Sequence, residues 1–132
     1  LYIFHVDGGP AGKATGKYPF DAPQALLKGI AAKQYGPYLS KEIGDVPLAF
    51  LSDLDSTGGN SGSATLNRHG EIVGLLFDGT YESMASDWVF LPKLTRSIHV
   101  DFRYVMWVMD AVDNADHLLL EMGAQPAIGN AE

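Results

Sequence analysis

Cysteine is absent from the sequence, which excludes a disulfide scaffold, thiolate chemistry and Cys-ligated zinc. No apolar run approaches the ~20 residues that a membrane helix requires, so no membrane span is expected. Basic residues are few: nine Lys and Arg against sixteen Asp and Glu give a formal net charge of −7. Because binding to a phosphate backbone needs clustered Lys and Arg, we expect no nucleic-acid partner. No two histidines stand at metal-ligand spacing, so neither a metal nor a cofactor is predicted.

The residues that are present are typical of one folded domain. The chain has 132 residues, of which 46% are hydrophobic and 19% are charged, and this length allows a sizeable core. Fifteen Gly and seven Pro favour turns and short strands over a helical bundle. There is neither an initiator Met nor a signal-peptide pattern at Leu1, so we expect the chain to be a piece of a longer protein.

The order of patterns along the chain predicts strands around a glycine-rich centre, with helices before and after them. The predicted elements are a strand (1–6), a glycine-rich loop (8–16), a helix (between 21 and 36), four short strands (46–51, 65–66, 71–77 and 88–91) and two helices (102–112 and 114–122). The helix over 102–112 carries few charges, so we expect it to be buried on nearly all sides. The last residues, 123–132, are expected to be a flexible tail.

The chemistry is concentrated in residues 56–63, which read Ser-Thr-Gly-Gly-Asn-Ser-Gly-Ser. The simplest interpretation of such a stretch is a flexible turn. A calcium loop starting at Asp53 would need Glu at its twelfth position, where Ala64 stands. A hydrolase nucleophile elbow would need a second glycine where Ser63 stands, followed by a helix instead of the predicted strand.

A third interpretation is the nucleophile loop of a trypsin-like serine peptidase, with Ser61 as the nucleophile. Gly59 permits the sharp turn that such a loop needs. The amides of Gly59 and Ser61 can then form an oxyanion hole for the tetrahedral intermediate. Gly62 leaves room for the substrate close to Ser61. A strand, a hairpin and a second strand should follow the loop, and the predicted elements agree with this order.

Longer motifs resemble a known family. Residues 57–63 are similar to the active-site segment of several bacterial trypsin-like peptidases, glutamyl endopeptidases among them. The continuation is more specific, because residues 70–82 and 98–105 resemble the bacterial dipeptidyl-peptidase 7 and 11 family. The resemblance covers about residues 20–122 and is poor over 1–19. It departs from the family at Ala64, where a proline is usual, and is closer to the dipeptidyl-peptidase 7 type because of Gly79.

This resemblance implies a fold, an activity and a set of site residues. The fold would be mainly β with flanking helices, and residues 1–122 would be the C-terminal part of a trypsin-like catalytic domain. Within it, 1–45 form a lead-in of loop and helix, 46–100 the strands of the second barrel of a double β-barrel, and 101–122 the C-terminal helices. The activity would be release of dipeptides from peptides with a free N-terminus. The parent would be periplasmic or on the cell surface, and family members are commonly homodimers.

The family's site residues are carried over one by one. Ser61 corresponds to the nucleophile, with Gly59 at the oxyanion hole. Asp78 corresponds to a residue that holds the substrate's N-terminal amine, and Gly79 to the residue that decides the specificity pocket. Gly79 implies a preference for an apolar or aromatic second residue. Without the resemblance, Asp78-Gly79 is also a common turn signal.

The triad is incomplete in this sequence. In trypsin-like chain order the catalytic His and Asp precede the serine, and His5 is the only histidine before Ser61. Too few residues separate the two to build a barrel between them, and the later histidines, His69, His99 and His117, are interpreted as surface or packing residues. We therefore expect the catalytic His and Asp to lie in the remainder of the parent domain and the isolated chain to be inactive. The alternatives are a glutamyl-type endopeptidase and a non-catalytic binding module on the same fold.

Overall fold

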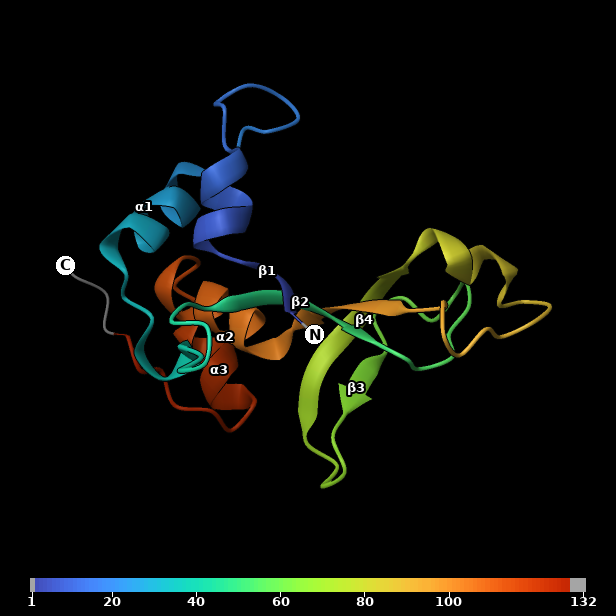
Figure 1. The fold of residues 1–132 in the computed structure, drawn as a ribbon. Coiled ribbons are helices and arrows are strands. Elements are labelled where there is room, and N and C mark those ends of the chain that lie inside the picture. Colours follow the sequence, from blue (N-terminus) through green and yellow to red (C-terminus); the bar gives the residue numbers. More distant parts are fainter. Residues whose placement is uncertain (1, 129–132) are drawn as a thin grey trace. The chain divides into compact units, whose positions relative to one another are not determined.

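The computed structural model describes residues 2–128, which form two compact units (Figure 1). Unit 1 consists mainly of Leu48–Phe102, and unit 2 of Phe4–Pro47 together with residues 103–128. No helix within residues 2–128 is both long enough and apolar enough to cross a membrane. Residues 56–63 and most of the strand sequence belong to unit 1, whereas most of the helical sequence belongs to unit 2.

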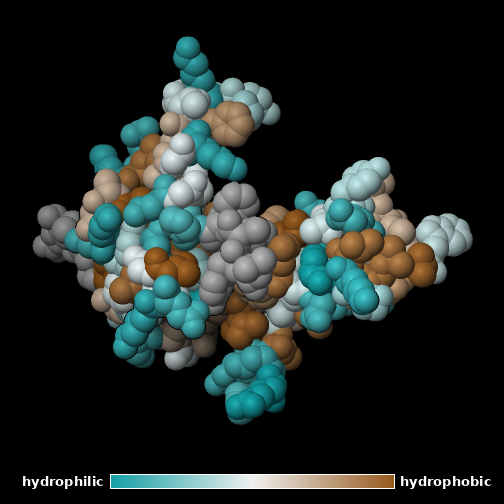
Figure 2. Space-filling view, in the orientation of Figure 1, coloured by the Kyte–Doolittle hydropathy of each residue, from teal (hydrophilic) through white to brown (hydrophobic). Residues whose placement is uncertain are grey.

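An antiparallel sheet forms the framework of unit 1. Its strands are β1 (Tyr2–His5), β2 (Pro47–Ser52), β3 (Ala64–Leu66), β4 (Ile72–Gly79) and β5 (Ser97–Asp101), in the order β1-β2-β5-β4-β3. Strand β5 pairs antiparallel with both β2 and β4, and β4 pairs antiparallel with β3. The predicted hairpin joins β3 to β4, with Gly70 at φ +79° in its turn. The tip of this hairpin is hydrophilic in Figure 2, as expected for a turn in water.

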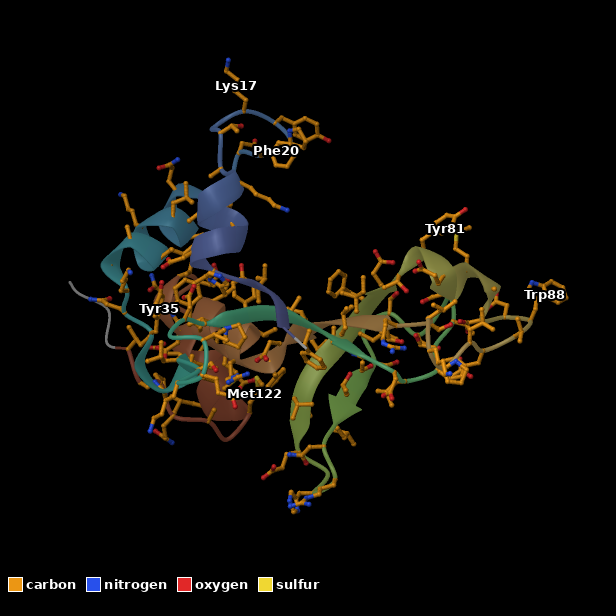
Figure 3. All side chains as sticks on the ribbon, viewed as in Figure 1. Lys17, Phe20, Tyr35, Tyr81, Trp88 and Met122 are labelled. Atoms are coloured by element: carbon orange, nitrogen blue, oxygen red, sulfur yellow. The ribbon has the colours of Figure 1, made fainter. Side chains whose placement is uncertain are left out.

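One strand of this sheet was predicted in the wrong place. Residues 88–91 form no strand, whereas β5 lies further along the chain. The reason is that the buried positions of β5 are the polar residues Ser97, His99 and Asp101, so hydrophobic alternation does not reveal it. The segment before β5 instead contains a short 3₁₀ helix, η3 (Tyr81–Ala85). Tyr81 and Trp88 are 83% and 92% exposed and point away from the sheet (Figure 3).

Helices and aromatic side chains form unit 2. Its helices are α1 (Gln24–Ala32), α2 (Phe102–Ala111) and α3 (Asp116–Glu121), and its core contains Val6, Ile30, Tyr35, Tyr38, Val46 and Trp107. The Nε1 of Trp107 donates a hydrogen bond to the carbonyl of Gln34 over 3.0 Å. The glycine-rich segment predicted as a loop contains a helical turn, η1 (Asp7–Ala11).

The environment of α2 differs from its prediction. Trp107 and Asp110 are its buried residues, and the remaining positions of this helix are partly exposed in the described part of the chain. Asp110 is buried because it has partners: the hydroxyl of Tyr38 donates to its Oδ2 over 2.8 Å. The amides of Ala127 and Ile128, within the segment predicted as a flexible tail, also donate to this carboxylate. Residues 129–132 of that predicted tail lie outside the described residues.

Candidate active site

The loop over residues 53–63 connects β2 to β3 and carries Ser61. We call it the serine loop. Its backbone requires two glycines, because Gly59 and Gly62 have φ values of +96° and +88°, a region that L side chains rarely adopt. The carbonyl of Thr57 accepts a hydrogen bond from the amide of Asn60, and the amide of Thr57 donates to the side-chain oxygen of Asn60 over 2.9 Å. These two bonds close a tight turn immediately before Ser61.

The exit of the serine loop is fixed to β4. The amide of Gly62 donates to the carbonyl of Leu76 over 2.7 Å, and the amide of Leu76 donates to the carbonyl of Ser63 over 3.0 Å. Leu76 is itself buried in the middle of β4. Because this pair of bonds begins one residue after Ser61, the position of the serine relative to β4 is set by the sheet.

The amides of Gly59 and Ser61 are among the serine-loop amides that have no hydrogen-bond acceptor within residues 2–128. The amides of Asn60, Gly62 and Ser63 all donate hydrogen bonds to backbone carbonyls. By contrast, the amide of Gly59, just before Asn60, and the amide of Ser61, just after it, donate no hydrogen bond to any group within residues 2–128. Ser61 is also exposed. Free backbone N–H groups next to an exposed serine are what an oxyanion hole requires, which is the role predicted for these two amides.

A cavity of about 220 Å³ in unit 1 brings three of the predicted residues together. Ser61 reaches it from the serine loop, and Asp78 and Gly79 reach it from the end of β4. Gly59 does not line this cavity, although its neighbour Gly58 does. Asp78 is the only charged residue that lines it among the residues described. Ser61 therefore shares one small cavity with Asp78 and Gly79, which are 17 and 18 positions further along the chain.

A β-bulge determines how Asp78 is presented. Leu76 pairs with His99, but Asp78 pairs with the neighbouring Ile98, so Phe77 is an extra residue in β4. Such bulges bend a strand and change the direction of its side chains, often next to active sites. The strand continues to Gly79, which still pairs with β5. Asp78-Gly79 is therefore not a chain reversal, and the turn interpretation of this dipeptide is wrong.

Gly79 also has a packing role that the sequence did not reveal. A Cβ atom at this position would lie 2.9 Å from the Cβ and 3.0 Å from the Oγ of Ser83. Ser83 belongs to η3, and its hydroxyl donates to the carbonyl of Arg96 over 2.9 Å. Because η3 approaches the end of β4 so closely, the strand needs a residue without a side chain at position 79.

The hydroxyl of Ser61 has no histidine partner among the described residues. His69 lies in the exposed hairpin turn and accepts a hydrogen bond from the Nε of Arg68. His99 is buried in unit 1 and uses both ring nitrogens in hydrogen bonds to other side chains. In unit 2, His5 contacts Asp45, and His117 is exposed on α3. Within residues 2–128, no histidine lines the cavity.

Comparison with known proteins places the chain among the peptidases. Residues 4–124 match the family described as Peptidase S46, and the chain belongs to this peptidase S46 family. An Asp/Glu-specific dipeptidyl-peptidase of Shewanella putrefaciens is 44% identical over 135 residues, covering 86% of this chain and 18% of that protein. The dipeptidyl-peptidase 7 of Capnocytophaga gingivalis is 45% identical over 107 residues, covering 81% of this chain and 15% of the relative.

A solved structure is also similar to this chain. The crystal structure of Porphyromonas endodontalis DPP11 in complex with the dipeptide Arg-Asp matches with a TM-score of 0.85 and 31% identity. The match covers 92% of this chain and 17% of that one. The resemblance to the dipeptidyl-peptidase 7 and 11 family is therefore confirmed. The chain spans less than a fifth of the length of each of these relatives.

Proposed function

We propose that this chain supplies the nucleophile and the substrate-binding residues of a serine dipeptidyl-peptidase. One observation carries the proposal: Ser61, Asp78 and Gly79 line the same small cavity. The unpaired amides of Gly59 and Ser61 support it, because they are available to a developing oxyanion. The catalytic His and Asp would come from the remainder of the parent enzyme.

The positions of these residues define a sequence of chemical steps. A base from the remainder of the parent accepts the proton of Ser61, whose Oγ then attacks the carbonyl carbon of the scissile bond. The amides of Gly59 and Ser61 stabilise the negative charge that develops on the carbonyl oxygen. The intermediate then collapses with cleavage of the C–N bond, the base returns the proton to the leaving amine, and water hydrolyses the acyl-enzyme. Asp78 pairs with the ammonium group of the free N-terminus. A nucleophile and an ammonium-binding carboxylate that line one cavity would fix the distance from the free N-terminus to the scissile bond, and the family resemblance implies that this distance is a dipeptide.

The lining of the cavity favours an apolar or aromatic second residue. Leu76, Phe77 and Met84 contribute apolar surface, and no Lys or Arg of the described residues lines the cavity. Recognition of an acidic side chain would need a cationic partner, for which a guanidinium is best suited. Some of the relatives are named for Asp/Glu specificity and others are not. We place this chain with the second group because glycine stands at position 79.

Further proposals follow from the family resemblance. The parent enzyme would act in the periplasm or at the cell surface and would be a homodimer. The catalytic domain of the parent enzyme would be a trypsin-like double β-barrel, and the sheet of unit 1 would belong to its second barrel.

The proposed function is tested with the full-length parent enzyme and a panel of dipeptidyl fluorophores. The panel compares Met, Leu and Phe with Asp and Glu at the second position, each with a free and with an acetylated N-terminus. We expect cleavage of the free apolar substrates, no cleavage of the acetylated ones, and loss of activity in Ser61→Ala. Equal cleavage of acetylated substrates would contradict the exopeptidase proposal and favour an endopeptidase. Preference for Asp or Glu over all apolar residues would refute the role of Gly79.

A further inference from the structure

His99 connects the two ends of the serine loop. This side chain is on β5 and only 1% exposed. Its Nε2 lies 2.6 Å from the hydroxyl of Ser52, the last residue of β2 before the loop. Its Nδ1 lies 2.7 Å from the hydroxyl of Thr65, in β3 after the loop. A single imidazole ring therefore joins the strand that enters the loop to the strand that leaves it.

The ring of His99 is held in one orientation. Phe50 stacks on it, with 4.9 Å between the ring centroids and 14° between the planes. Phe50 in turn lies over Gly74, where an added Cβ would come within 2.7 Å of its Cε1. The stack therefore depends on a glycine in β4. Held in this way, the ring directs one nitrogen to each end of the serine loop.

Ser97, two residues before His99 on the same face of β5, supports the first half of the loop. Its hydroxyl donates to the carbonyl of Leu54 over 2.8 Å and contacts the hydroxyl of Ser56. Both partners are in the serine loop. Two buried polar residues of β5, Ser97 and His99, thus make side-chain hydrogen bonds to the loop and its flanks.

We propose that His99 is a positioning residue that holds the serine loop in the conformation required for attack by Ser61. A neutral imidazole has one donor and one acceptor on opposite sides of its ring, which suits two hydroxyl partners on opposite sides. Burial lowers the pKa of His99 and so favours this neutral form. His99 is not the base, because both nitrogens are already engaged by Ser52 and Thr65. This inference rests on the proposed function.

The test uses the full-length parent enzyme with three variants. His99→Leu removes both hydrogen bonds, and His99→Gln keeps a donor and an acceptor at the end of a side chain. His69→Gln, in the exposed hairpin turn, is the matched control. We expect His99→Leu to lower kcat by about 10- to 100-fold, with KM within about threefold of wild type, because a displaced nucleophile costs rate even when the substrate still binds. His99→Gln should recover most of kcat, and the control should not change it.

The rate at which a fluorophosphonate labels Ser61 is the second measurement, because it reports the reactivity of the serine without a peptide substrate. We expect slower labelling in His99→Leu, normalised to the folded fraction in a thermal melt. Unchanged kcat and labelling in this variant would overturn the inference. If His99→Leu does not fold, Thr65→Val and Ser52→Ala each remove one hydrogen bond, and wild-type kcat in both would overturn it equally. A wild-type parent without dipeptide release would refute the proposed function instead.

Discussion

The amide of Gly79 donates a hydrogen bond to Oδ1 of the preceding residue, Asp78, over 2.8 Å. This bond orients the carboxylate from its own backbone and leaves Oδ2 available to a ligand. It also links the two proposed recognition roles, since the residue for the substrate amine and the residue for its second side chain are consecutive. Any change of backbone at position 79 will therefore alter the orientation of Asp78 as well.

Asp78→Asn tests the binding of the substrate amine in the parent enzyme. The amide oxygen of Asn can still accept the hydrogen bond from Gly79, so the fold of this strand end should persist. Removal of the charge leaves the substrate ammonium unpaired, which costs about 2–5 kcal/mol when the pair is shielded from water. We expect kcat/KM to fall by roughly 10²- to 10³-fold, whereas Asp87→Asn, at another exposed aspartate, should have no effect. Near wild-type cleavage by Asp78→Asn would show that the carboxylate does not bind the amine.

Gly79→Arg tests specificity, and the structure predicts that it needs a second change. The new Cβ would lie 2.9 Å from that of Ser83, so the single variant must displace η3 and should lose activity on all substrates. The double variant Gly79→Arg, Ser83→Gly removes the clash and places a guanidinium at the cavity. We expect it to shift preference toward Asp and Glu in the fluorophore panel, because of the charge pair with the substrate carboxylate. Ser83→Gly alone is the control, and an unchanged preference in the double variant would argue against Gly79 as the selector.

Gly59→Ala and Gly58→Ala form a matched pair for the oxyanion hole. Neither added Cβ would have a neighbour within 4 Å, but only Gly59 has a positive φ, of +96°. A side chain there costs roughly 1–2 kcal/mol of backbone strain and changes the direction of the amide of Gly59. We expect Gly59→Ala to lower kcat at least about tenfold, and Gly58→Ala to remain within about twofold of wild type. Equal effects of the two substitutions would show that backbone conformation is not the cause.

The 132-residue chain by itself should be inactive. Ser61 has free amides beside it but no histidine partner in the described part of the chain, and loss of triad members costs several orders of magnitude in rate. We expect no dipeptide release and no labelling of Ser61 by a fluorophosphonate. Both are measured against the full-length parent at equal concentration. Rapid stoichiometric labelling of the isolated chain would prove that a base is present within it.

Asp45 should make the stability of unit 2 depend on pH. Its burial opposes ionisation, but hydrogen bonds hold the pKa of this carboxyl below its usual value, and their donors are the amide of Asp7, the ring of His5 and the amide of Val46. Because the folded-state pKa is lowered, the ionised carboxylate stabilises the fold above the unfolded value of about 3.9. This contribution is lost as the pH falls through the folded-state pKa.

Asp45→Asn should therefore be less stable than wild type at pH 7, by about 1–3 kcal/mol, and the difference should shrink below about pH 4. The measurement is urea unfolding of the 132-residue chain carrying Trp88→Phe, which leaves Trp107 in the core of unit 2 as its only tryptophan. Asp55→Asn, at an exposed position, is the control. A stability difference that does not shrink as the pH falls from about 5 to about 3 would show that ionisation of Asp45 is not its source.

The sequence by itself predicted those parts of the molecule that depend on neighbouring residues. Gly59 and Gly62 stand where the backbone has positive φ, and such turn sterics follow from local residue type. The predicted hairpin, which has Gly70 in its turn, is local in the same sense and is present. The family resemblance depended on short motifs of consecutive residues, and it is confirmed by the comparisons.

Only the tertiary structure decided which distant residues meet. The bonds of His99 reach partners 34 and 47 positions away in the sequence, and no spacing rule relates such residues. Its strand was missed because buried positions were expected to be apolar, whereas those of β5 are polar, and Ser97 and His99 among them form side-chain hydrogen bonds. The cavity that joins Ser61 to Asp78 likewise depends on a bulge in β4. Local sterics can be deduced from neighbouring residues, but pairing across a sheet depends on the register that the whole unit adopts.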